Sequence, residues 1–124
     1  MNSSPTRPHR PVAPSNWREM LCWLLRRRRR FHVSGESMLP TLTPGDIVFV
    51  KDTMVPEKGD IVCAIHPHNP SITIVKRVSF IDDHGKAFLV SDNPSADGAT
   101  DSSRFGLVQP SLLRGVVTSR LRIN

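Results

Sequence analysis

One stretch decides the fold of this chain, Ile72-Thr73-Ile74-Val75-Lys76-Arg77-Val78-Ser79-Phe80-Ile81. Its β-branched and aromatic residues favour a strand. Because side chains alternate between the two faces of a strand, Ile72, Ile74, Lys76, Val78 and Phe80 share one face. The other four are large and apolar, which predicts that this face is buried and that Lys76 is buried with it.

A buried lysine is a candidate general base. Taking an ammonium group out of water is unfavourable, so burial lowers the pKa of Lys76 and favours the neutral amine, which can act as a general base. The strand pattern alone leaves two other interpretations open. The amine can reach water from the end of a strand, and a bulge near Lys76 would change the face that it occupies.

A serine that could use such a base lies in the loop Ser34-Gly35-Glu36-Ser37-Met38-Leu39-Pro40-Thr41-Leu42. Serines in loops of this composition usually cap turns, so Ser37 carries little weight by itself. Together with a buried Lys76 it predicts a hydrolase that uses a serine and a lysine.

Charge is unevenly distributed along the 124 residues, whose formal net charge is +6. Residues 1–30 hold eight arginines against one glutamate, a net charge of +7, whereas residues 31–124 have a net charge of −1. Because residues 31–124 are nearly neutral, they lack the positive charge that would neutralise nucleic-acid phosphates. We therefore expect no specific nucleic-acid partner.

Cysteines and histidines give no sign of a disulfide framework or a metal site. Cys22 lies in the N-terminal segment and Cys63 in an expected core strand, where it serves as a small apolar residue. The pair His66 and His68 is expected in a turn, and no Cys/His spacing fits a closed metal site. We therefore expect no cofactor.

Residues 1–30 are expected to form a basic tail, disordered over its proline-rich first half, with one short amphipathic helix that starts near Asn16. The apolar face of this helix comprises Trp17, Met20, Leu21, Leu24 and Leu25. A run of five arginines, residues 26–30, follows it. The uninterrupted apolar run of the helix is far shorter than the about 20 residues of a transmembrane helix, and no signal-peptide cleavage site follows it.

Two interpretations of the segment from Trp17 to Arg30 stay open. It can lie on an anionic membrane surface as an interfacial helix, or it can pack on the domain's own surface. Both predict a cytoplasmic protein without a transmembrane helix, and the first adds peripheral membrane contact.

From Phe31 to Asn124 the sequence predicts an all-β domain, small, antiparallel and complex in topology. Two copies of Gly-Asp-Ile-Val, at residues 45–48 and 59–62, introduce strands that we expect to pair with each other. Residues 82–86 are expected to form a hairpin turn to a strand at 87–90, and the last strand is expected at 115–121. A long polar loop, 91–105, is typical of a functional loop.

Three ordered sequence boxes resemble the type I signal peptidase family of Ser-Lys proteases. They are Ser37-Met38-Leu39-Pro40-Thr41-Leu42 with Pro44-Gly45-Asp46-Ile47-Val48, then Lys76-Arg77-Val78, then Ser91-Asp92-Asn93-Pro94 with Asp101-Ser102 and Phe105-Gly106. The short length and the third box look most like the nickel-type superoxide dismutase maturation proteases. That likeness implies removal of an N-terminal leader from the dismutase precursor.

The resemblance also implies roles for individual residues. Ser37 would be the nucleophile and Lys76 the general base, with the backbone at Gly35 and Ser37 forming the oxyanion hole. Val33 and Val75 would line a small apolar pocket for the residue before the cut. Gly35 stands where many members of the family have a serine.

The third box would supply a supporting loop with Asp92, Asn93, Thr100, Asp101 and Arg104, although it departs from the family pattern. Ala99 stands where the family has a serine that bonds the lysine, so Thr100 is a candidate substitute. Ser103 stands where the family has an arginine, so an ion pair between Asp101 and Arg104 is a further hypothesis.

Three other functions are compatible with the sequence. A general leader peptidase for exported proteins usually carries a membrane-spanning segment, which we do not find here. A self-cleaving regulator like the SOS repressors cuts an Ala-Gly or Cys-Gly bond, and this chain contains neither dipeptide. The third alternative is a β domain without enzymatic activity that binds lipid or nucleic acid through its arginine-rich segment.

Overall fold

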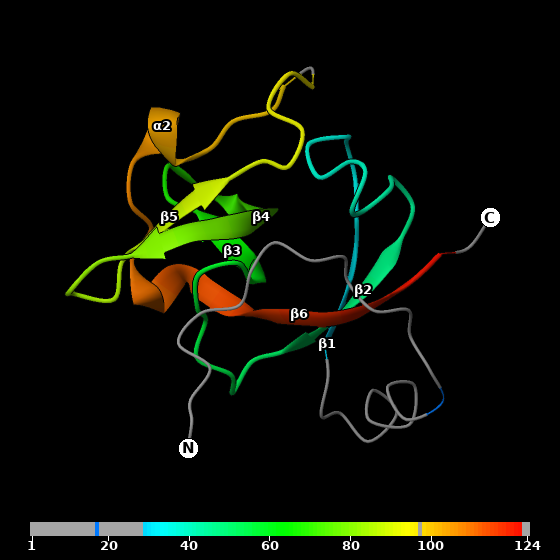
Figure 1. Cartoon of the computed structure of the whole chain (residues 1–124), viewed down its shortest axis with the longest axis horizontal. Helices are drawn as coiled ribbons and strands as arrows, with labels where there is room; N and C mark the ends of the chain where they lie inside the picture. Colours follow the sequence, from blue (N-terminus) through cyan, green and yellow to red (C-terminus); the bar gives the residue numbers. More distant parts are fainter. Residues whose placement is uncertain (1–16, 18–28, 97, 123–124) are drawn as a thin grey trace.

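The computed structural model describes Trp17, residues 29–96 and residues 98–122. In this part of the chain, six strands form one antiparallel sheet in the order β1-β2-β6-β3-β4-β5 (Figure 1). The elements are β1 (Arg29–His32), β2 (Ile47–Lys51), β3 (Ile61–His66), β4 (Asn69–Ile81), β5 (Ala87–Val90), α2 (Ser102–Phe105), the 3-10 turn η1 (Pro110–Leu112) and β6 (Leu113–Leu121). The predicted all-β fold is confirmed.

Most of the predicted N-terminal tail and helix lies outside the described residues. Trp17 is exposed, and Arg29 and Arg30 form the first two positions of β1, opposite Val50 and Phe49 of β2. The sheet thus begins two residues before the boundary expected at Phe31. No helix in the described part of the chain is long and apolar enough to cross a membrane.

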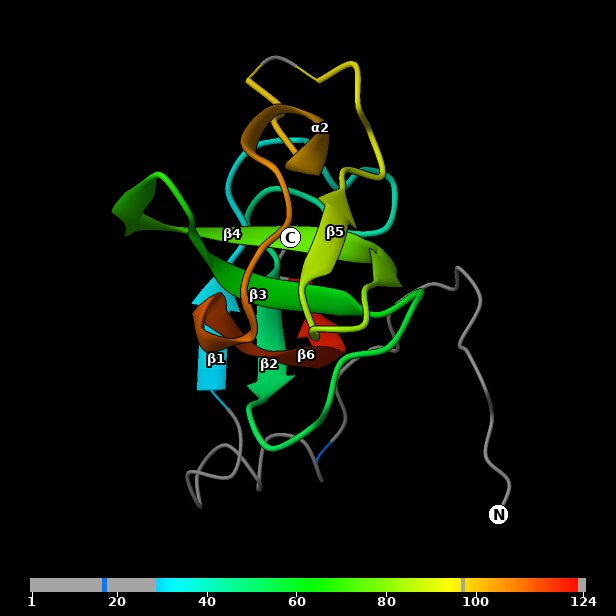
Figure 2. The same cartoon turned by 90° about the vertical axis from the view of Figure 1, so that its left-hand side faces the viewer.

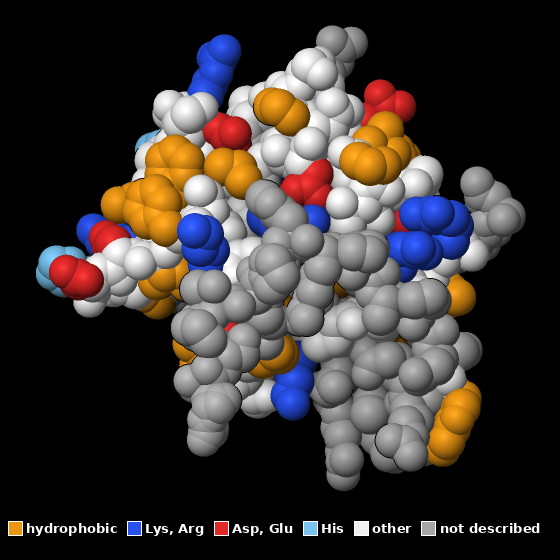
Figure 3. Space-filling view, in the orientation of Figure 1, with side chains coloured by type: hydrophobic (Ala, Val, Ile, Leu, Met, Phe, Trp, Pro, Cys, Tyr) orange, Lys and Arg blue, Asp and Glu red, His pale blue; other side chains and the backbone are white. Residues whose placement is uncertain are grey.

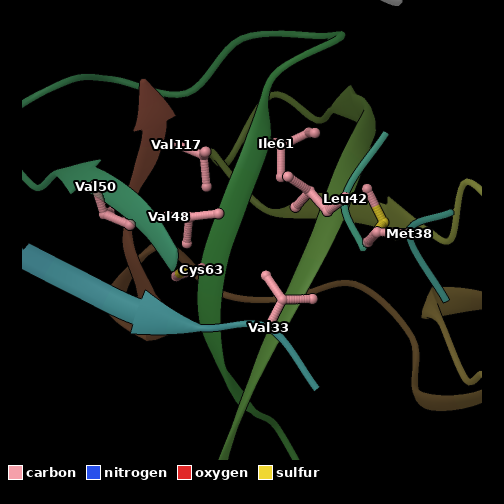
Figure 4. Packing of buried hydrophobic residues seen from close by; sticks show 8 residues of the cluster. All are labelled: Val33, Met38, Leu42, Val48, Val50, Ile61, Cys63 and Val117. Carbon is pink, nitrogen blue, oxygen red and sulfur yellow. The ribbon is translucent and has the colours of Figure 1, made fainter. Parts of the chain in front are cut away.

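Two apolar clusters hold the sheet together, and β3 and β6 contribute to both. Alternate residues of β3 enter different clusters because they point to opposite faces of the strand. The first cluster (Figure 4) comprises Val33, Met38, Leu42, Val48, Val50, Ile61, Cys63 and Val117. The second comprises Val62, Ala64, Val78, Ala87, Leu89, Phe105, Val108 and Val116. Burial on both faces explains why β3 has an almost uninterrupted apolar sequence.

Cys63 belongs to the first cluster and is fully buried, as the sequence predicts. Desolvation raises the pKa of its thiol to about 12. The thiol therefore stays protonated and acts as a small apolar group rather than as a reactive one.

The two Gly-Asp-Ile-Val copies form the same turn twice. The side chain of Asp46 accepts a hydrogen bond from Thr43 N, and that of Asp60 accepts one from Glu57 N, both at 2.9 Å. However, the prediction that the following strands pair with each other is wrong. β2 and β3 both pair antiparallel with β6, which lies between them, so they run parallel to each other and cannot form a hairpin.

The predicted burial of one face of β4 holds only at its centre. Lys76 and Val78 are buried, whereas Ile72 and Phe80 are 43% and 45% exposed. Phe80 instead stacks on Phe88 of β5 with ring centroids 5.1 Å apart. Orange side chains gather at the left of Figure 3, over this β4–β5 ribbon. Strand parity fails at Phe80, because a register shift between Val78 and Phe80 in the β4–β5 pairing places Phe80 opposite Phe88 and away from the face that Val78 shares with Leu89.

Gly115 allows β6 to pass close to β2, and this gives a stability prediction. Its φ is +150°, and an added Cβ would lie 2.6 Å from Val50 Cγ1 and 2.8 Å from the Lys51 carbonyl oxygen. We expect Gly115→Ala to lower the free energy of unfolding by about 2 kcal/mol or more, because the overlap must be relieved by shifting packed backbone. Urea unfolding measures the change. Gly106→Ala is the control, since Gly106 also has positive φ but open space around its Cβ position, and an equal loss in both variants would contradict the account.

Candidate active site

Ser37 lies in the loop between β1 and β2, and buried contacts fix this loop on both sides. Met38 and Leu42 are buried in the first apolar cluster. The loop is closed at its base because Val33 N donates to Asp46 O and Gly45 N donates to Val33 O, both at 2.8 Å. The backbone around Ser37 is thus positioned by the core.

Lys76 lies in the middle of β4, paired with Val62 of β3, and is 5% exposed. Burial lowers the pKa of its ammonium group, and the negative charge of Asp101 opposes this shift with a smaller effect. Its Nζ donates a hydrogen bond to Ser91 Oγ at 2.9 Å. The prediction of a buried lysine with a lowered pKa is confirmed.

One cavity of about 200 Å³ brings four of the predicted site residues together. Its lining includes Ser37 and Lys76, and also Val33 and Val75. The remaining lining residues are His32, Ser34, Met38, Ile72, Thr73 and Ile74. Val33 and Val75 also pack in or against the first apolar cluster, so they belong both to the core and to the cavity wall.

The cavity lies along an edge of β4. Among the described strands, β5 pairs with one edge of β4 only from Arg77 onward. The other edge of β4 pairs with β3 from Asn69. Figure 2 shows the loop 33–46 and the segment 91–96 on one side of β4, next to this edge. On the edge that faces away from β3, residues 72–75 pair with no strand in the described part of the chain, so this edge offers backbone groups beside Ser37 and Lys76.

Asp92 braces the serine loop against β4. Its carboxylate accepts a two-pronged ion pair from Arg77, from Nε at 3.0 Å and from Nη2 at 2.7 Å. It also accepts a hydrogen bond from Thr41 Oγ1 at 2.6 Å. Arg77 Nη1 donates to Gly59 O at 2.9 Å. This buried network links the strand that carries Lys76 to the loop that carries Ser37.

Asn93 contacts the serine loop directly. Its backbone N–H donates to Ser37 O at 2.7 Å, and its side-chain Nδ2 donates to Glu36 O at 3.1 Å. Gly35 has a φ of +75°, which places the backbone before Ser37 in the left-handed region that favours glycine. No acceptor within the described residues contacts the backbone N–H of Ser37, so this donor is available to a ligand.

The rest of the predicted supporting loop differs from expectation. Asp101 caps α2, where its side chain accepts hydrogen bonds from Ser103 N at 2.9 Å and Ser103 Oγ at 2.5 Å. The hypothesised ion pair with Arg104 is not among the ion pairs found between described residues, and Arg104 is exposed. Thr100 is also exposed, and the hydroxyl that contacts Lys76 belongs to Ser91.

Sequence reasoning did not assign three residues of this site. Ser91, Thr41 and Arg77 lie within the quoted boxes, but none was given a role. Arg77 had a usable signal, because an arginine inside an apolar strand requires a carboxylate partner when buried. Within the described residues, no group of three or more His, Cys, Asp or Glu side chains could hold a metal ion.

The Arg77–Asp92 pair gives a second stability prediction. The two side chains are 3% and 11% exposed. We expect Asp92→Ala to lower the free energy of unfolding by about 3 kcal/mol, because it leaves the Arg77 charge buried without its carboxylate. Chemical denaturation measures this loss. The matched double variant Arg77→Met/Asp92→Leu should regain most of it, and a double variant as unstable as Asp92→Ala would contradict the assignment.

Two comparisons place the chain among known proteins. A profile of the Peptidase S24-like family matches residues 28–101. The Signal peptidase I of Buchnera aphidicola subsp. Baizongia pistaciae (strain Bp) is 38% identical over 64 residues, in an alignment that covers 39% of this chain and 21% of that protein. The chain thus matches about a fifth of the relative's length.

Proposed function

Because this chain belongs to the Peptidase S24-like family, we propose that it is a serine endopeptidase in which Ser37 is the nucleophile and Lys76 the general base. One observation carries the proposal. Ser37 and the buried Lys76, from segments 39 residues apart in the sequence, line the same cavity. Lowering the pKa of the lysine by burial is what a general base at neutral pH requires.

The proposed reaction proceeds through an acyl-enzyme. Ser37 Oγ attacks the scissile carbonyl while Lys76 Nζ takes the hydroxyl proton. The backbone N–H of Ser37 donates to the oxyanion of the tetrahedral intermediate. Lys76 then gives its proton to the leaving amine, and the acyl group stays on Oγ. A water molecule, deprotonated by Lys76, attacks the ester and releases the new carboxyl terminus, while Lys76 returns the proton to the departing Ser37 Oγ.

The substrate is proposed to bind as an extended peptide along the unpaired edge of β4. Backbone groups at residues 72–75 can hydrogen-bond an added strand, as in other β-augmentation complexes. Such a strand would pass Ser37, and Val33 and Val75 would receive a small apolar side chain before the cut.

We propose that the biological substrate is a precursor protein with an N-terminal leader, and specifically the precursor of nickel superoxide dismutase. The support is the resemblance of the third sequence box, from Ser91 to Gly106. The second candidate is a general leader peptidase for exported proteins, which the similarity to a signal peptidase I favours.

A cleavage assay separates these candidates. The full-length protein is incubated with the dismutase precursor, with the mature dismutase as control, and with a precursor of an exported protein. Mass spectrometry then locates each new amino terminus. A cut at the junction of leader and mature dismutase supports the first candidate, and a cut in the exported precursor alone supports the second. Absence of cleavage in both would contradict the peptidase proposal and leave a binding domain.

A further inference from the structure

The side chain that contacts the lysine amine comes from an unexpected position. Ser91 directly follows β5, whose residue Val90 pairs with Arg77 of β4, and this pairing brings Ser91 next to Lys76. The Nζ–Oγ distance is 2.9 Å, and both residues are at most 8% exposed. A buried amine must have a hydrogen-bond partner, and here the partner is a hydroxyl on the neighbouring strand.

No hydroxyl from the 99–101 segment takes this place. Ala99 has no polar side-chain atom, Thr100 is exposed, and the Asp101 side chain is engaged in capping α2. Ser91 is therefore the side chain that restrains the amine within the described part of the chain. Resting on the function proposed above, we propose that Ser91 is a positioning residue that orients the Lys76 amine toward Ser37.

The chemistry of the amine explains how this contact would act. A neutral amine has two N–H bonds and one lone pair. When one N–H is held by Ser91 Oγ, rotation about the Cε–Nζ bond is restricted, and the lone pair can face the cavity that Ser37 lines. After Lys76 has taken a proton, Ser91 Oγ still accepts a hydrogen bond from the ammonium and stabilises it in a buried place.

Among the described residues, few charged or titratable groups lie around the amine. Asp101, at the start of α2, raises the pKa of Lys76, opposing the larger effect of burial. His32, at the end of β1, lines the same cavity. Arg77 and Asp92 neutralise each other next to it in an ion pair. Loss of the Ser91 acceptor removes a stabilising partner of the ammonium form, so the pKa of Lys76 should fall further.

Kinetics and a direct titration together test the inference. For Ser91→Ala we expect kcat to fall by at least about tenfold, since loss of alignment of a reacting group lowers the rate, while KM changes little. The acidic limb of the pH–rate profile should move to lower pH. Ser91→Thr retains the hydroxyl and should recover most of kcat. Ser119→Ala, a buried serine on β6 outside the cavity lining, is the matched control and should keep the wild-type profile.

The titration does not depend on activity. NMR of lysine labelled at Cε, with the Lys76 signal identified by its loss in Lys76→Met, should show Lys76 titrating at lower pH in Ser91→Ala than in the wild type. Active Ser91→Ala with unchanged kcat and unchanged titration would overturn the inference and leave the proposed function intact. If the wild type cleaves nothing, the proposed function fails and the orienting role fails with it. A shifted titration would then show only that Ser91 solvates a buried lysine.

Discussion

Ser37→Ala is expected to abolish peptide cleavage while leaving the protein folded. The side chain is only partly buried and contributes one oxygen to the cavity, so its loss removes the nucleophile without opening the core. We expect kcat to fall by at least about 10³-fold, in line with the loss of nucleophiles in other serine hydrolases. The assay is cleavage of the preferred precursor, with product quantified by mass spectrometry.

A second serine variant controls for nonspecific effects of this replacement. Ser111 lies exposed on η1, outside the lining of the cavity. Ser111→Ala should cleave at the wild-type rate. Retention of more than a small residual activity by Ser37→Ala, in protein purified free of other peptidases, would rule out Ser37 as the nucleophile.

Lys76→Met should remove activity as completely as Ser37→Ala. The replacement keeps a long side chain of similar shape and deletes the amine that would accept the proton. Because general-base catalysis contributes about 10²- to 10⁴-fold, and the amine must also protonate the leaving group, we expect a loss in kcat of at least about 10³-fold. Lys76→Arg should be equally inactive, since a guanidinium does not lose its proton in this pH range. An active Lys76→Arg would contradict the general-base role.

The same lysine predicts a pH dependence of stability. Its pKa in the folded protein is below the ordinary value, so between these two pKa values the unfolded chain binds more protons than the folded one. The free energy of unfolding of the wild type should therefore increase, relative to that of Lys76→Met, as pH rises through this window. Denaturation of both proteins across the alkaline range measures the difference. Equal pH dependence in the two proteins would show that Lys76 is not desolvated.

The strand pattern predicted the environment of Lys76 because alternation is a local property of the backbone. The burial of Lys76 and Val78, the hairpin from β4 to β5 and the all-β class all followed from short-range sequence features. The exposure of two residues did not. Ile72 lies before the part of β4 that β5 pairs with, and the register shift between Val78 and Phe80 turns Phe80 to the other face of the strand.

Strand partners were harder to predict than strands. The repeated Gly-Asp-Ile-Val signal identified two turns with the same hydrogen bonds at Asp46 and Asp60. It gave no information on pairing, because β6, from the end of the chain, enters the sheet between β2 and β3. A contact of that kind depends on the whole topology rather than on a local pattern.

In the candidate active site, too, the residues could be predicted from local sequence, but the contacts between distant residues could not. Ser37, Lys76, Val33 and Val75 were predicted together and lie around one cavity. The contacts of Lys76 with Ser91 and of Arg77 with Asp92 each join residues 15 positions apart across the β4–β5 pairing. No sequence signal fixed the register of the β4–β5 pairing. The resemblance therefore pointed to the positions of Ala99 and Thr100, rather than to Ser91, for the partner of Lys76.

The most direct test of the Ser37–Lys76 assignment is a digest of one complex peptide library by the wild type, Ser37→Ala and Lys76→Met at equal concentration, with the new termini identified by mass spectrometry. The account predicts a set of cuts after small apolar residues in the wild type, all of them absent from both variants. Cuts that persist in either variant, or a library left intact by the wild type, would contradict it.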